Sequence, residues 1–404
     1  MIEESPIHGA GAPSEGGHTV PLRFSENPPL PTPPRRRRTG LLLGITGAVL
    51  LIAAAGTVQV TANAGYDTAE QDFRAAARST AETRTEVDDA RNLLEGTTDS
   101  AALILDGDTG ALVDPAAKEA VAEAASTATE ALASADSLLA ERVPAVGEKP
   151  IWFWELLGAT GSLEQDRRDV DALEERLGEA TGEISVATDS LTDAGITLLT
   201  TTADSATAFE AAHLSAKNDA VIALRDSAVA AAGTTAIDED AVTAFTALQT
   251  AAAQLVASEK SELAEKSGPL LNARLEIEAF ARKLAPGVLL DFDWAPIVNG
   301  VGYDGSMGGY TTWWWDDPGR ATIELSNSVA EQWPADRSKA LVAHEVGHAI
   351  SVKCADMYDS STQDSIEKWA TAWAISMGYT DDANGVWAYG YPPQNYIDAA
   401  AGCR

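Results

Sequence analysis

The chain has few basic residues and only two cysteines. In 404 residues, 28 lysines and arginines stand against 61 aspartates and glutamates, a formal net charge of −33. This balance excludes general nucleic-acid binding, because little basic charge is present to neutralise phosphates. Two cysteines exclude little, but Cys354 and Cys403 are most simply one disulfide if this part of the chain lies in an oxidising compartment.

Charge of either sign is absent from Thr39 to Tyr66, and Leu41 to Val60 is almost entirely apolar. About 20 such residues cross the hydrocarbon core of a membrane as a helix. Arg35 to Arg38 come just before, and positive charge stays on the cytoplasmic side. We therefore expect a single-pass cell-membrane protein with a transmembrane helix at 41–63 and its C-terminal part outside the cytoplasm. A cleaved signal peptide is the alternative, since Ala62-Asn63-Ala64 offers a small-residue cleavage pattern.

Residues 1–40 hold 8 of the 18 prolines and show no apolar periodicity. That composition is typical of a disordered segment. We expect a disordered cytoplasmic tail.

Residues 64–285 are rich in alanine and carry apolar residues in heptads. The first series is Tyr66, Phe73, Thr80, Val87 and Leu94, and the second is Leu163, Val170, Leu177, Ile184 and Leu191. So narrow a stripe packs helix against helix. The segments EGTTDS, VPAVGEKP and AAGTTAIDED, with a weaker break at DAG near Gly195, divide the region into five or six helices, many of them about 25 to 30 residues long. We expect an alanine-rich antiparallel bundle or stalk, able to bind a cell-envelope protein.

Residues 286–404 have a different composition, with eight of the ten tryptophans. Such a block can bury a core of its own, and core packing is favoured over a sugar-stacking platform. GGYTTWWW (308–315) and ATIELS (321–326) flank the turn DDPG and are predicted to be two strands. The whole chain is therefore expected to be mainly α with a small α+β domain at its C-terminus.

One short motif carries recognisable chemistry: His344-Glu345-Val346-Gly347-His348. On a helix capped by Asp336, His344 and His348 lie one turn apart on one face, so both imidazoles can reach one metal ion. Glu345 lies beside them, where a carboxylate can take a proton from water bound to the metal. Zinc suits two imidazoles and one carboxylate, with a fourth position left for water.

The third metal ligand cannot be a later histidine, because none follows His348. Glu367 is favoured, since it opens the helical segment EKWATAWAISMG and its separation from His348 leaves room for a loop and a returning helix. Cys354 and Asp359 remain alternatives.

ATIELSNS, ALVAHEVGHAIS and EKWATAWAISM together resemble the gluzincin arrangement, particularly the small ImmA/IrrE-type metallopeptidases. The resemblance covers roughly residues 320–380, and the bundle has no counterpart in it. It implies a minimal zincin domain with a short sheet and two metal-ligand helices. His344, His348 and Glu367 would be zinc ligands, and Glu345 would be the general base. The expected export of this chain departs from that family, so a cytoplasmic regulatory role does not transfer.

The function expected from these features is a membrane-anchored, extracytoplasmic zinc metalloendopeptidase that cleaves a peptide or protein. Stabilising the oxyanion needs a second donor besides zinc, and Tyr391 is our candidate, with Tyr389 and Tyr396 as alternatives. The strand ATIELS could bind an extended peptide along its edge. The competing hypothesis is a structural or binding stalk with a degenerate zincin domain, although intact His344, Glu345, His348 and Glu367 argue against degeneration.

Overall fold

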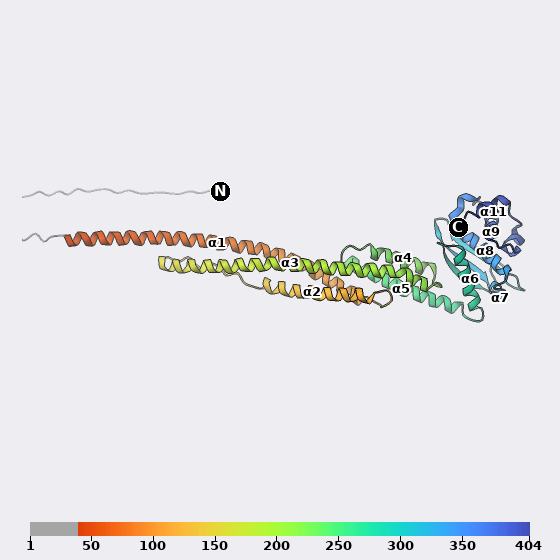
Figure 1. Ribbon diagram of the computed structural model, residues 1–404, viewed down its shortest axis with the longest axis horizontal. Helices are drawn as coiled ribbons and strands as arrows, with labels where there is room; N and C mark the ends of the chain where they lie inside the picture. Colours follow the sequence, from red (N-terminus) through yellow and green to blue (C-terminus); the bar gives the residue numbers. More distant parts are fainter. Residues whose placement is uncertain (1–38) are drawn as a thin grey trace, which may run out of the picture.

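The computed structural model describes residues 39–404, with side chains from residue 54 onward. A long rod of helices ends in a small α+β head (Figure 1). The rod consists of α1 (Thr39–Asp106), α2 (Pro115–Leu139), α3 (Phe153–Ala212), α4 (Asn218–Ala232) and α5 (Glu239–Glu265). The expectation of a mainly α protein with a small sheet is confirmed. The predicted tail, apart from its last two residues, lies outside the described residues.

Two helices of the rod are much longer than the sequence suggested: α1 has 68 residues and α3 has 60. EGTTDS does not end α1, which continues through this segment. The hydroxyls of Thr97 and Thr98 donate to the carbonyls of Leu93 and Leu94, one turn earlier in the same helix. Gly195 does not break α3 either. An added Cβ there would lie 2.6 Å from the Ile237 side chain, so this glycine permits close packing. The breaks at VPAVGEKP and AAGTTAIDED are confirmed.

The expected antiparallel bundle is wrong for the two longest helices, because α1 and α3 run in the same direction. Gln59 Nε2 donates to the Ile151 carbonyl and, further along α1, Thr80 Oγ1 donates to the Val170 carbonyl. The higher-numbered residue of α1 thus pairs with the higher-numbered partner, as it does in parallel helices. Only α2 runs back between them, and it is shorter. The non-helical segment that follows it completes the return, because extended chain covers more than twice the length of helix per residue.

The heptad positions form the interior of the rod as expected. Tyr66, Phe73, Leu163 and Val170 share one buried cluster. The next cluster along the rod contains Val87, Leu94, Leu177, Ile184 and Leu191. The heptad pattern therefore predicted which residues are buried, although it did not give the direction of the partner helix.

The membrane-spanning prediction rests on residues that the structure describes only in part. Within residues 54–404, no helix carries an apolar stretch long and continuous enough to cross a membrane. Most of the predicted span, 41–63, precedes residue 54. Its backbone belongs to α1, and its side chains before residue 54 lie outside the described part of the chain.

The head contains α6 (Leu271–Leu284), β1 (Leu289–Ala295), β2 (Gly309–Trp314), β3 (Asp317–Ser326) and α7 (Asn327–Glu331). It continues with α8 (Asp336–Ser351), η1 (Val352–Met357), α9 (Gln363–Ser376), η2 (Asp382–Asn384), α10 (Val386–Tyr389) and α11 (Gln394–Ala400). The sheet order is β1-β3-β2, with β1 parallel and β2 antiparallel to β3. The two predicted strands are present as β2 and β3, and β1 was not predicted.

This order corrects the expected peptide-binding edge. ATIELS lies in β3, between β1 and β2, so both its edges are paired. Among the described residues β2 pairs on one side only, and its Thr311 bonds to Glu345 of α8. The strand edge next to the metal motif is therefore that of β2.

One core joins the sheet to α6, α8, α9 and α11, and Trp369 and Trp373 are fully buried in it. Ile277 and Ala281 place α6 in this core although they precede the composition change at Pro286. The expected disulfide is confirmed between Cys354, just after α8, and Cys403, with Cα atoms 6.0 Å apart.

Rod and head are joined by polar contacts at the start of α4. The backbone N–H of Asn218 donates to Asp291 Oδ1, and its side-chain amide donates to the carbonyls of Leu289 and Ala321. Lys217 Nζ lies 2.7 Å from Asp293 Oδ1. These contacts fix the strand pair β1–β3 to the end of the bundle.

Candidate metal centre

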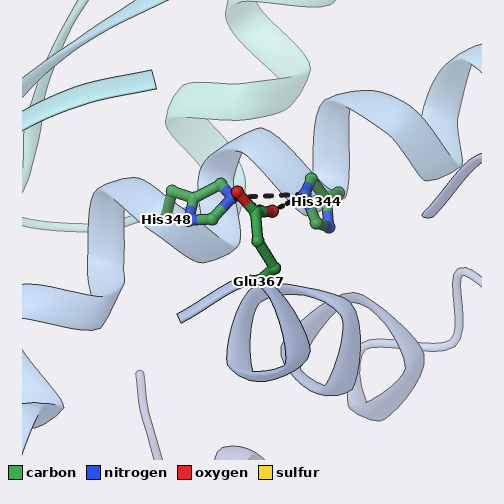
Figure 2. Close-up of side chains that lie close together, drawn as sticks. All are labelled: His344, His348 and Glu367. Carbon is green, nitrogen blue, oxygen red and sulfur yellow. Dashed lines mark hydrogen bonds and ion pairs between the residues drawn. The ribbon is translucent and has the colours of Figure 1, made fainter. Parts of the chain in front are cut away.

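Three side chains from α8 and α9 converge on one point (Figure 2). His344 and His348 lie one turn apart on α8, and Glu367 reaches them from near the start of α9. His344 Nε2 and His348 Nε2 are 3.2 Å apart, and Glu367 Oε2 is 3.3 Å from the first and 3.1 Å from the second. All three residues are largely buried. The structure thus brings together the three ligands expected from the sequence.

The spacing of these donor atoms fits a small metal ion. Ligand bonds of about 2.0–2.1 Å in a tetrahedral zinc site place neighbouring ligand atoms about 3.3 Å apart. The three measured separations lie at or just below this value. Two imidazoles with one carboxylate are also a donor set that zinc commonly takes in catalytic sites. His348 Nδ1 is buried and has no hydrogen-bond partner among the described residues, so nothing there fixes the tautomer that Nε2 ligation requires.

Neighbouring side chains hold the ligands in place. Gln363 Nε2 donates to Glu367 Oε1 at 2.7 Å, which leaves Oε2 directed at the histidines. Thr371 Oγ1 donates to the Glu367 carbonyl and lies 3.4 Å from His344 Nδ1. The Trp313 ring stacks on His348 at 5.3 Å between centroids. Both imidazoles and the carboxylate are therefore oriented before any metal binds.

Gly347, between the two histidines, allows the second ligand helix to approach. An added Cβ would lie 2.8 Å from the carbonyl oxygen of Ala370 and 3.0 Å from its Cα. Because backbone atoms cannot turn away, a side chain at this position would push α8 and α9 apart. The glycine of the motif is thus required for Glu367 to reach the histidines.

Glu345 does not join the ligand cluster but is fixed beside it. Thr311 Oγ1 of β2 donates to Glu345 Oε2 at 2.7 Å, and the carboxylate packs against the backbone of Gly309. Burial raises the pKa of this carboxyl, and the nearby His344 and the Thr311 hydroxyl offset part of the rise. A carboxylate with a raised pKa is a better proton acceptor for a general base.

Glu367 has the opposite electrostatic situation. Burial opposes its ionisation, but hydrogen bonds from His344 and His348 outweigh burial and hold the pKa of this carboxyl well below its usual range. It therefore remains a carboxylate at any physiological pH. Environments that push two neighbouring carboxyl pKa values apart suit them to different roles: Glu367 is suited to be a charged ligand and Glu345 to be a proton acceptor.

The structure places Tyr389, not the expected Tyr391, beside these groups. The Tyr389 ring is nearly parallel to His344 at 5.9 Å between centroids. Burial, with the charges of Glu367 and Glu345, raises its pKa to about 12. Tyr391 is 69% exposed and does not line the hollows at the site, while the Tyr396 hydroxyl bonds Ser365. Tyr389 is therefore the tyrosine positioned to donate a hydrogen bond.

The two alternative third ligands lie elsewhere. Cys354 is bonded to Cys403. Asp359 is exposed and accepts hydrogen bonds from Ser361. Asp336 is the first residue of α8 rather than its cap, and within the described chain its side chain makes no capping hydrogen bond.

Two adjoining hollows open onto the site, and both are lined by Asn299, Gly309, His344, Glu345 and Tyr389. One, of about 230 Å³, also contacts His348, Glu367 and Thr311, so it reaches every candidate ligand. The other, of about 220 Å³, extends to Val301, Met307, Leu341 and Trp387 and is mainly apolar. A substrate in this cleft would contact both the metal ligands and Glu345.

Sequence reasoning missed three groups that shape the site: Gly309, Thr311 and Trp313. All three are in β2, which was predicted as a strand but not linked to the histidine helix. Thr311 lies 34 residues from Glu345, and no local pattern gives that contact.

Comparison of the chain with protein-family models, with curated proteins and with solved structures finds no match.

Proposed function

We propose that this chain is a zinc-dependent peptidase whose catalytic head is carried by a helical rod anchored in the cell membrane. One observation carries the proposal: three donor atoms within about 3.3 Å of one another lie next to a buried carboxylate that is not one of them. A ligand set with a separate proton acceptor, both open to a cleft, is the arrangement needed for metal-assisted hydrolysis. The resemblance to gluzincins agrees with this assignment.

His344, His348 and Glu367 would hold the zinc ion, which supplies Lewis acidity to activate water and polarise a carbonyl group. Glu345 accepts the proton of the attacking water and returns it to the amine that leaves. Thr311 keeps the Glu345 carboxylate facing the cleft. Tyr389, with its pKa of about 12, stays protonated at neutral pH and donates to the oxyanion that forms on the carbonyl.

The substrate proposed is an extended peptide segment. The outer edge of β2 has backbone groups that can pair with a further strand, and this strand contributes Gly309, Thr311 and Trp313 to the cleft. Met307, Leu341 and Trp387 line the apolar hollow beside Glu345. An apolar side chain next to the cleaved bond would fill it.

The membrane anchor is the proposed role of the charge-free run Thr39 to Tyr66, with the head outside the cytoplasm. The N-terminal part of α1 projects beyond the rest of the bundle (Figure 1). Protease added to intact cells stripped of their wall should then remove the head. Full protection of the head would contradict the proposed export.

The test of the peptidase measures zinc content and peptide cleavage on the full-length protein in detergent. We expect one zinc per chain and cleavage of unstructured peptides. Glu345→Gln keeps the ligands, so zinc should remain while turnover falls about 10²–10⁴-fold, the usual contribution of a general base. Glu367→Ala removes a ligand, so zinc affinity should fall sharply.

Asp359→Asn is the matched control, because it changes an exposed carboxylate in the same region. It should leave both zinc and activity unchanged. Tight, stoichiometric zinc binding by Glu367→Ala would show that the third ligand is another residue. A zinc-loaded wild-type protein that cleaves no peptide would favour the stalk with a degenerate head.

A further inference from the structure

The start of α3 lies at the end of the bundle away from the head (Figure 1). Large apolar side chains are exposed together there. Ile151 is 78% exposed, Trp152 55%, Trp154 56% and Leu157 58%. The two indole rings stack on each other at 5.3 Å with nearly parallel planes. These four residues are called the apolar tip. Trp152 and Trp154 are the only tryptophans outside the C-terminal block, so the rod has aromatic surface of this kind at one end only.

Gln59 of α1 fixes the apolar tip through both ends of its side-chain amide. Gln59 donates from Nε2 to the Ile151 carbonyl at 2.9 Å and accepts from the Phe153 backbone N–H at 2.9 Å. Both bonds go to backbone, so the tip is held at one level of α1. Below that level, the residues of α1 whose exposure the structure describes, 54–58, are all exposed.

This level matches the end of the apolar run from Leu41 to Val60. From Leu41 to Gln59 a helix rises about 27 Å, close to the hydrocarbon thickness of about 30 Å. The ion pair between Lys149 and Asp67 lies just beyond the tip, toward the head. An apolar lone helix, an aromatic layer and then a charged layer therefore follow one another along the rod.

We propose that the apolar tip inserts into the outer interfacial region of the same bilayer that α1 crosses. The inference rests on the proposed membrane anchor and is independent of the peptidase activity. Tryptophan is enriched at this depth because its ring is apolar while its N–H needs a polar neighbour. The tip adds a second attachment beside α1, and two attachments prevent the rod from tilting freely about one helix.

The test uses the full-length protein in phosphatidylcholine vesicles whose acyl chains carry bromine near the headgroup. Bromine quenches only indoles at its own depth, and the other eight tryptophans lie in the head. We expect loss of up to about a fifth of the emission, the share of two tryptophans among ten. Trp152→Phe with Trp154→Phe should abolish this quenching. Trp387→Phe, which removes an even more exposed indole in the head, should leave the absolute size of the quenching unchanged.

The outcomes separate the two proposals. Protein that floats with the vesicles but shows no bromine-dependent quenching overturns the inference and leaves the anchor intact; the tip would then be a surface for a protein partner. Protein that does not float with the vesicles overturns both. Quenching that persists in the double variant also overturns the inference, because it would come from tryptophans of the head.

Discussion

Gly309→Ala tests whether the position of Glu345, rather than its mere presence, governs hydrolysis. An alanine Cβ at this site would lie 2.3 Å from Glu345 Oε1 and 2.7 Å from its Cδ. Ordinary contact begins near 3.4 Å, so the carboxylate has to move by about 1 Å, and a misplacement of this size can cost about 100-fold in rate. The three atoms nearest to the added Cβ all belong to Glu345, so the strain falls first on this side chain.

We therefore expect kcat/KM for peptide cleavage to fall by about 100-fold or more, with zinc still stoichiometric. Overpacking should lower the free energy of unfolding by about 1–3 kcal/mol, which a denaturant titration can measure. Gly319→Ala is the matched control on β3, where an added Cβ meets only Asp317 Oδ1 at 3.8 Å, and it should behave as wild type.

Wild-type kcat/KM in a folded, zinc-loaded Gly309→Ala protein would refute this reasoning, because the displaced carboxylate could not then be the base. Loss of zinc in the same variant would also refute it, since the strain would have passed to the ligands instead.

Three further outcomes can be measured. Gly347→Ala should separate α8 from α9, so that zinc affinity falls in a metal titration and the melting temperature drops, with about 1–3 kcal/mol lost. Replacing both Cys354 and Cys403 with serine opens a loop with a sequence separation of 49 and should cost about 4 kcal/mol in denaturant unfolding; an unchanged midpoint would contradict this. Burial raises the pKa of Asp291 to about 6, above its unfolded value. The folded protein therefore favours the protonated carboxyl, and the free energy of unfolding falls as pH rises from about 4 through 6. Asp291→Asn should remove this fall in the free energy of unfolding, which is on the order of 3 kcal/mol. An equal shift in melting temperature between pH 4 and pH 7 for the wild type and the variant would contradict the prediction.

Local patterns predicted the parts of the site that depend on one helix. The spacing of His344 and His348 places both on one face whatever surrounds the helix, and Glu367 follows on the next long helix. The structure was needed for contacts between distant segments: Thr311 with Glu345, and the choice of Tyr389 over Tyr391, which depends on how the chain turns after α9.

The fold shows the same division. Heptads predicted the buried residues of the rod, but parallel and antiparallel partners bury the same stripe, so the direction of α3 could not be read from it. β1 was missed although Leu290 and Phe292 alternate with Asp291 and Asp293. That alternation was a usable signal, because one face of β1 is buried in the head.

The length of α3 sets where the head can act. Sixty helical residues span about 90 Å, and α1 packs beside them in parallel over much of that length, which stiffens the rod. The contacts of Lys217 and Asn218 with the sheet leave little freedom at the far end. Under the membrane anchor proposed above, the cleft would sweep a thin layer at a nearly constant height above the lipid. Sites close to the bilayer surface would then be out of reach, and only proteins that extend tens of ångströms outward would meet the proposed catalytic residues.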